Sequence, residues 1–104
     1  MVTEWRFVKL PKYPNRIICD DGKIYNEKGR ILSLKPGKGR YLRCRMYNSG
    51  YESYTWVHRM VCYAFVGDCT NKDVHHKDKN RRNNHWTNFK IMTEKEHQLE
   101  HKKI

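Results

Sequence analysis

The sequence predicts an α+β fold in which a small antiparallel β meander and one helix come first, and a β-hairpin followed by a second helix comes last. Short apolar runs between turn-forming residues are typical of strands, and they fill residues 1–56. Apolar residues at helical spacing follow, and then two extended segments flank a polar turn. The length of 104 residues leaves room for one small domain with a limited core.

Turn-forming residues divide the first part of the chain into short segments. They lie at residues 13–15, 20–22 and 28–29. The segments between them, residues 17–19 and 23–25, are therefore expected to be strands. The apolar run at residues 31–34 predicts a further strand, and the glycine and lysine residues within 35–40 predict a loop.

A strand and a helix are predicted in the middle of the chain. Residues 41–47 alternate between aromatic or aliphatic and basic side chains, so Arg43 and Arg45 should share one face of a strand. A helix is expected at residues 57–65, with Gly67 ending it, because apolar residues recur there at helical spacing. These apolar residues are Val57, Met60, Val61, Ala64 and Phe65.

The last third of the chain predicts a hairpin and a helix. Residues 73–77 are expected to be extended, residues 78–85 to form a polar turn, and residues 89–92 to be the returning strand. Thr93 and Glu96 have the spacing of a capping box, so a helix should run from there to the C-terminus.

The charge of the chain points to a polyanionic partner. Lys and Arg number 22 against 11 Asp and Glu, which gives a formal net charge of +11. Such an excess suits nucleic acid. A membrane surface would attract it too, but no segment approaches the roughly 20 apolar residues of a spanning helix, and no signal-peptide pattern opens the chain. We therefore expect a soluble, cytoplasmic protein that binds nucleic acid.

The cysteines are expected to be reduced and packed in the core. None of them forms a CxxC pair, which disfavours a zinc ribbon, and metal binding and disulfide pairing remain the less favoured alternatives. The four are Cys19, Cys44, Cys62 and Cys69.

Histidines and an asparagine recur in the second half of the chain with a spacing that indicates chemistry. His75 and His76 are adjacent, Asn88 follows, and His97 and His101 lie one helical turn apart. Imidazoles at that spacing can bind one divalent ion, and a further imidazole can act as a base near neutral pH. Hydrolysis of a phosphodiester needs both. Because successive side chains on a regular strand face opposite ways, His75 and His76 should lie at an irregular strand end if both are to reach one phosphate.

A wider set of residues carries a family resemblance. It comprises residues 57–61 and 65, Val74-His75-His76-Lys77-Asp78-Lys79-Asn80, Asn83-Asn84, Asn88-Phe89 and Glu96-His97. These resemble the HNH endonucleases of phages and mobile introns, a branch of the His-Me finger nucleases. The first half resembles the nuclease-associated modular element that often precedes such domains, through Trp5, Tyr13, residues 21–26 and Gly39-Arg40-Tyr41. The resemblance implies a DNA-binding region at residues 1–56 and an HNH core with a ββα-metal unit at residues 57–104, in one compact domain.

The resemblance also implies a role for each residue of the motif. His76 would be the general base, and Asn88 would fix the hairpin and orient that base. His97 would be the closing metal ligand, and His101 matches an extra helical histidine of colicin-type DNases. His75 stands where many intron-encoded relatives carry an aspartate. A ligand set of three imidazoles favours zinc, nickel, cobalt or manganese over the magnesium of those relatives.

Basic residues gather in two groups that are expected to bind the phosphates of double-stranded DNA. The first group contains Arg40, Arg43 and Arg45 with Lys35 and Lys38, and the second contains Lys77, Lys79, Arg81 and Arg82. The tryptophans and tyrosines are expected to pack in the core or at its rim. His58 is expected to make a structural hydrogen bond, and His85 to be solvated.

The favoured function is a metal-dependent DNA endonuclease of phage or mobile-element origin, acting in homing or with a packaging terminase or another phage protein. One alternative is a noncatalytic DNA-binding module braced by a histidine-bound zinc, and another is an RNA-binding or ribosome-associated basic protein. His76 separates the first two, because a structural zinc site has no use for an unligated histidine beside the ion.

Overall fold

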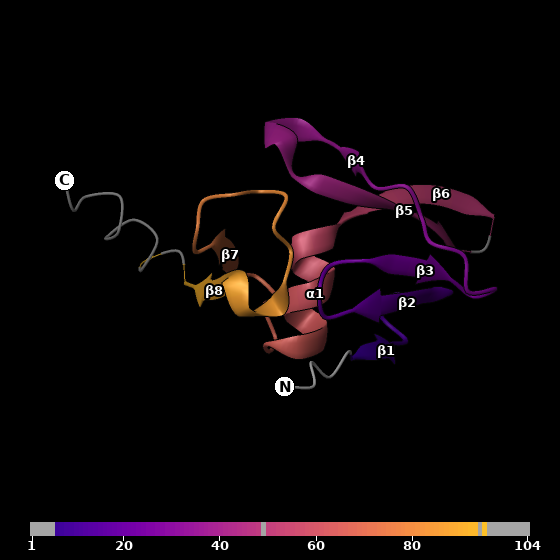
Figure 1. Cartoon of the computed structure of the whole chain (residues 1–104), viewed down its shortest axis with the longest axis horizontal. Coiled ribbons are helices and arrows are strands. Elements are labelled where there is room, and N and C mark those ends of the chain that lie inside the picture. Colours follow the sequence, from indigo (N-terminus) through magenta and orange to yellow (C-terminus); the bar gives the residue numbers. More distant parts are fainter. Residues whose placement is uncertain (1–5, 49, 94, 96–104) are drawn as a thin grey trace, which may run out of the picture.

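The computed structural model describes residues 6–48, 50–93 and 95, in which three small groups of strands surround one α-helix (Figure 1). The elements in order are β1 (Phe7–Lys9), β2 (Arg16–Cys19), β3 (Ile24–Asn26), β4 (Lys35–Pro36), the 3-10 helix η1 (Lys38–Arg40), β5 (Leu42–Asn48), β6 (Tyr51–Trp56), α1 (Val57–Phe65), β7 (Asp73–His76), the 3-10 helix η2 (Trp86–Asn88) and β8 (Phe89–Met92). The strands form two three-stranded antiparallel sheets, β1-β2-β3 and β4-β5-β6, and the hairpin β7-β8. The α+β prediction is confirmed.

Helix α1 lies at the centre of the molecule and contacts β2, β5, β6 and β7 (Figure 1). Its Val57, Met60 and Val61 side chains are fully buried, which is the apolar face that the spacing predicted. The helix ends where the backbone N–H groups of Val66 and Gly67 both donate to the carbonyl of Cys62. The predicted helix at residues 57–65 is therefore confirmed.

Residues 31–34 are not the strand that their apolar run predicted. Only Ile31 forms a bridge, to Tyr25, and its side chain is 58% exposed. Leu32 and Leu34 pack half-buried against the core, so the run is apolar because of packing and not because of strand pairing. Strand β4 lies instead inside the segment that was predicted to be a loop.

Strand β6 was not among the predicted elements, although it is the long partner of β5. The two strands pair from Arg43 opposite Trp56 to Asn48 opposite Tyr51. On β5 the Cys44 and Met46 side chains are buried on the face opposite to that of Arg43 and Arg45, so the predicted common face of the two arginines is confirmed.

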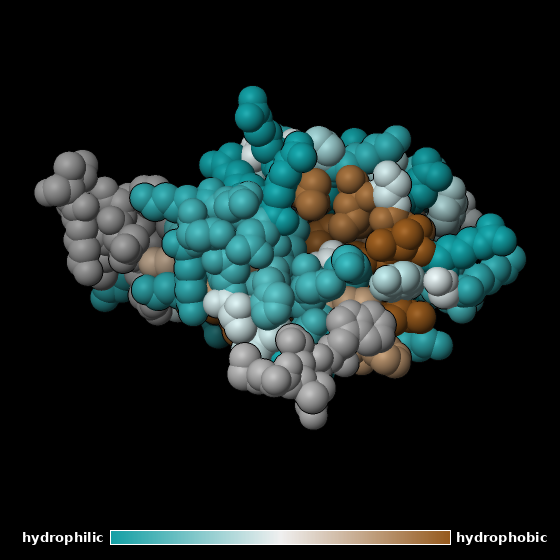
Figure 2. Space-filling model, viewed as in Figure 1, coloured by the Kyte–Doolittle hydropathy of each residue, from teal (hydrophilic) through white to brown (hydrophobic). Residues whose placement is uncertain are grey.

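The core contains the small thiol side chains, and polar side chains cover part of the surface. All four cysteines are free thiols and are buried, as expected for small core residues. Figure 2 shows hydrophilic side chains over the β7-β8 side of the face in view. Apolar side chains gather on the side of the two three-stranded sheets. No helix in the described ranges has the length and apolar character that a membrane span requires.

Candidate functional site

The hairpin predicted from the sequence is present and ends at the histidine pair. Strands β7 and β8 pair from Asp73 opposite Met92 to His76 opposite Phe89. Side chains alternate along β7, so Val74 and His76 are buried whereas Asp73 and His75 are half-buried. His76 is the last residue of the strand, and the irregular loop begins directly after it.

The loop that joins β7 to β8 is held together by Asn88. The Asn88 Nδ2 group donates to Asp78 Oδ1 and to the Asn83 carbonyl, both at 2.9 Å, and Asn88 Oδ1 accepts from the backbone N–H of Asp78 at 3.1 Å. Hydrogen bonds from Asn83, from the Asn80 backbone and from Asn88 lower the pKa of Asp78. Asn88 is buried, so water does not compete for these bonds. Its geometry is that of a residue that fixes the hairpin.

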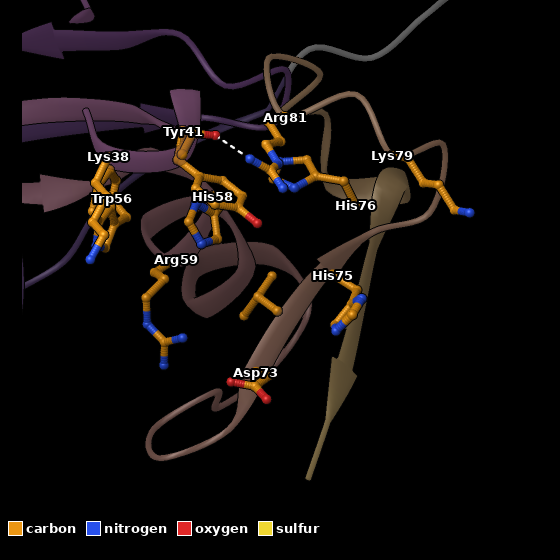
Figure 3. Close-up of a pocket in the computed structure, with 12 residues that line it drawn as sticks. Lys38, Tyr41, Trp56, His58, Arg59, Asp73, His75, His76, Lys79 and Arg81 are labelled. Atoms are coloured by element: carbon orange, nitrogen blue, oxygen red, sulfur yellow. Dashed lines mark hydrogen bonds between the residues drawn. The ribbon is translucent and has the colours of Figure 1, made fainter. Parts of the chain in front are cut away.

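A cleft of about 810 Å³ opens beside the end of β7. It is lined by Lys38, Gly39, Tyr41, Trp56, His58, Arg59, Asp73, Val74, His75, His76, Lys79 and Arg81. Figure 3 shows the side chains of His58, His76 and Arg81 gathered near Tyr41, with His75 apart from that group. The cleft thus joins β7 and its loop to α1 and to the η1 region of the N-terminal half.

The His76 ring is enclosed on several sides. Its centroid lies 5.8 Å from the Tyr41 ring in a stacked arrangement, 5.4 Å from the His58 ring and 5.3 Å from the edge-on Phe89 ring. Its Nε2 atom lies 2.8 Å from Oδ1 of Asn84, which is itself buried. The ring is therefore held in one orientation at the wall of the cleft.

Several residues of the cleft were not predicted as site residues. His58 was expected to make a structural hydrogen bond, yet its Nδ1 atom is buried and has no hydrogen-bond partner among the described residues. Tyr41 was expected only to pack, and it contacts both His58 and His76. The adjacent Asn83 and Asn84 are the sequence signal that could have suggested the Asn84 contact, but asparagines in a polar turn are most simply turn formers that bond their own backbone. His85 is not simply solvated, because its ring accepts the backbone N–H of Thr87 and so caps η2.

Burial of His58 gives a prediction for stability against pH. Desolvation, with smaller contributions from His76 and Arg59, lowers the pKa of His58 from 6.5 to about 4. The unfolded chain therefore binds this proton more readily than the folded chain, and the free energy of unfolding should fall by about 3 kcal/mol as pH drops from about 6.5 to about 4. Urea unfolding at several pH values in this window measures it. Over the same drop in pH, the free energy of unfolding of His58→Gln should fall less than that of wild type. An equal fall in both proteins would contradict His58 as the source of the pH dependence.

Of the three predicted metal ligands, only His75 lies in the described part of the chain. It lines the cleft from β7, opposite Lys90, and Asp73 lies on the same face of the strand. His97 and His101, and the helix predicted to carry them, lie outside the described residues. Within the described ranges, no three His, Cys, Asp or Glu side chains gather into a metal-binding group. A half-buried imidazole on a cleft wall nevertheless suits a borderline transition metal as one of its ligands.

The predicted DNA-binding residues fall on two surfaces. Lys79 and Arg81 line the cleft, and the Arg81 guanidinium lies 4.7 Å from the Tyr41 ring and donates to the Gly39 carbonyl. Lys77 and Arg82 are exposed in the same loop, and Arg40 is exposed in η1. Arg43 and Arg45 line a separate groove of about 580 Å³, together with Arg16, Lys28, Arg30 and Lys35. There Arg43 lies over the Tyr54 ring and Arg45 pairs with Glu52 at 2.9 Å.

Known proteins are similar to this chain in sequence and in fold. This chain is 35% identical, over an alignment of 97 residues, to an uncharacterised HNH endonuclease of Acanthamoeba polyphaga mimivirus. The match covers 86% of this chain and 28% of that protein. This chain is 27% identical, over an alignment of 97 residues, to the H-N-H endonuclease F-TflII of Escherichia phage T5. That match covers 89% of this chain and 50% of the phage protein. The chain thus spans half or less of the length of these relatives.

A solved structure that describes DNA binding and cleavage by the HNH homing endonuclease I-HmuI matches this fold with a TM-score of 0.77 and 28% identity. The match covers 98% of this chain and 61% of that one, so it includes the N-terminal sheets as well as the hairpin. Residues 55–99 match the HNH endonuclease family, and they include α1, the hairpin and both histidines of β7. Residues 55–99 of this chain are therefore similar to the HNH endonuclease family, and its fold is similar to that of an HNH homing endonuclease.

Proposed function

We propose that this chain is a metal-dependent endonuclease that hydrolyses phosphodiester bonds of double-stranded DNA, with His76 as its general base. The observation that carries the proposal is the position of His76 at the end of β7, on the wall of a cleft that Lys79 and Arg81 also line. A base beside fixed positive charge is the arrangement that attack of water on a phosphate requires.

In the proposed reaction, His76 accepts a proton from a water molecule whose oxygen attacks the scissile phosphorus. The bond from phosphorus to the 3′ oxygen breaks, and that oxygen takes a proton from solvent, which leaves a 5′-phosphate and a 3′-hydroxyl. Arg81 and Lys79 bind phosphate oxygens, and Asn88 keeps the loop that carries both of them in place.

The proposed ligands of the metal are His75, His97 and His101. A divalent ion held by these residues would supply positive charge to stabilise the phosphate and the leaving oxygen. Three neutral imidazoles favour zinc, nickel, cobalt or manganese, whereas His75 with oxygen ligands would suit magnesium as well.

The N-terminal half is proposed to bind the duplex away from the scissile bond. Arg43 and Arg45 line the second groove with four more basic side chains and a single acidic one, Glu27. A groove of this charge suits the phosphate backbone. On this proposal residues 1–56 are a DNA-binding region and residues 57–104 are the nuclease core.

Incubation of the purified protein with supercoiled plasmid and a panel of divalent ions tests the proposed function. Nicked or linear plasmid should form with at least one ion and should not form when a chelator is present from the start. Binding of the plasmid without cleavage across the whole panel would favour a noncatalytic DNA-binding module.

The affinity for DNA is expected to depend steeply on salt. If about four phosphates are neutralised, the dissociation constant should rise about 100-fold between roughly 50 and 200 mM salt. Replacing Lys79 by Gln should lower the slope of the logarithmic salt plot by about one, whereas Lys9→Gln, outside both basic surfaces, should not change it. Fluorescence anisotropy on a labelled duplex measures these slopes, and a salt-independent affinity would contradict phosphate binding.

A further inference from the structure

The side chains of Asn84 and His76 form a hydrogen bond. The two atoms, Asn84 Oδ1 and His76 Nε2, are 2.8 Å apart, and the side chains are only 3% and 8% exposed as residues. An amide oxygen can only accept, so Nε2 must carry the hydrogen. Because the pair is shielded from water, the bond is stronger than the same contact on the surface.

The consequence of this bond is a defined base atom. A neutral imidazole carries one ring hydrogen, so a hydrogen on Nε2 leaves the lone pair of Nδ1 to accept a proton. The rings of Tyr41, His58 and Phe89 pack around the same imidazole and oppose its rotation. Packing alone sets the plane of the ring, but the choice between its two nitrogens needs a polar partner.

Asn84 is in turn supported by the turn between β2 and β3. Gly22, at φ +95°, packs so closely that a Cβ atom placed on it would lie 2.7 Å from Asn84 Cβ and 3.1 Å from the Asn84 carbonyl oxygen. The same turn accepts the backbone N–H of Trp86 through the Asp20 carbonyl at 2.8 Å. The N-terminal sheet therefore touches the residue that holds His76.

We propose that Asn84 is a positioning residue for His76, and that the Gly22 turn of the N-terminal sheet keeps Asn84 in place. The proposal rests on the proposed function for the role of His76, but the hydrogen bond itself can be measured without any cleavage. On this proposal the N-terminal sheet helps to position the general base, in addition to its proposed role in binding DNA.

Substitutions at Asn84 test the bond. Asn84→Leu keeps the size but not the acceptor, whereas Asn84→Asp accepts from Nε2–H in either orientation of its carboxylate. Asn84→Leu should lower kcat about 100-fold and leave KM for DNA unchanged, and Asn84→Asp should restore most of kcat. Asn84→Leu would keep its activity if Asn84 were only filler, and Asn84→Asp would not restore activity if Asn84 acted as a donor. Either result would overturn the proposal.

Proton NMR gives a readout that a purely structural role would not move. A buried, hydrogen-bonded Nε2–H should give a downfield ring-proton signal that exchanges slowly with water and is absent from His76→Ala. The signal should be lost in Asn84→Leu and kept in Asn84→Asp. A signal that persists in Asn84→Leu, or that comes from Nδ1, would overturn the proposal even if every variant were inactive.

Two glycines give a matched pair for the supporting turn. Gly22 and Gly29 both have positive φ, at +95° and +81°, but a Cβ on Gly29 meets nothing within 4 Å. Both Gly→Ala variants carry the backbone strain of that conformation. Only Gly22→Ala should also lose the His76 signal and the turnover, and equal behaviour of the two variants would remove Gly22 from the proposal. Full activity of His76→Ala would refute the proposed function instead, whatever the NMR signal shows.

Discussion

Replacing His76 by Ala is expected to lower the rate of DNA cleavage about 1,000-fold, because a positioned general base contributes roughly 10²- to 10⁴-fold. The substitution removes the imidazole from the cleft wall, where it is stacked on Tyr41 and bonded to Asn84. On the proposed ligand set it removes no metal ligand, and it leaves Lys79 and Arg81 in the cleft. Affinity for DNA and for the metal should therefore stay close to that of wild type.

Single-turnover cleavage with excess protein measures this effect separately from binding. His85→Ala is the matched control, because that histidine caps η2 and does not line the cleft. It should cleave at nearly the wild-type rate. Near wild-type turnover by His76→Ala would end the assignment of His76 as the base. If that variant is unfolded, as circular dichroism would show, the polar substitution His76→Asn takes its place.

Replacing His97 by Ala is expected to weaken the binding of zinc or nickel more than any other single substitution. Loss of an outer hydrogen-bond partner of a ligand typically costs about 10- to 100-fold in metal affinity, so loss of a direct ligand should cost about 100-fold or more. His101→Ala should cost less, because the resemblance gives His101 to one branch of the family only and water can replace it.

Calorimetric titration of the metal into wild type, His97→Ala and His101→Ala measures these affinities, with His85→Ala as the control. If both helical variants bind as tightly as wild type, the site of three histidines is wrong. An ion held near His75 mainly by oxygen ligands, such as magnesium, would then be the better description.

Periodic segments of this chain could be predicted from the sequence because their pattern repeats over several residues. The apolar spacing of α1 gave its bounds, and the two extended segments with a polar turn between them gave the hairpin. Strand β6 lacks such a pattern, because its side chains from Tyr51 to Tyr54 are exposed and its pairing with β5 depends on a distant segment. The strand predicted at residues 31–34 was wrong for the opposite reason, since the run is apolar because it packs against the core, and its pairing is limited to the bridge from Ile31 to Tyr25.

Only some residues of the candidate site could be predicted from the sequence. His75, His76 and Asn88 could be selected from their spacing, because the hairpin places them locally. His58 and Tyr41 could not, since α1 and the N-terminal half bring them to His76 through tertiary packing. The contact between Gly22 and Asn84 joins residues that are far apart in the sequence, and no local pattern announces it.

The state of the cut DNA ends tests the central claim most directly. Water attack with departure of the 3′ oxygen leaves a 5′-phosphate and a 3′-hydroxyl, which DNA ligase can reseal. Plasmid nicked by the wild-type protein with a divalent metal should therefore be closed again by ligase, and neither the chelated protein nor His76→Ala should produce resealable nicks. Breaks that ligase cannot seal, or cleavage that continues equally in the presence of chelator, would contradict metal-dependent hydrolysis at this cleft.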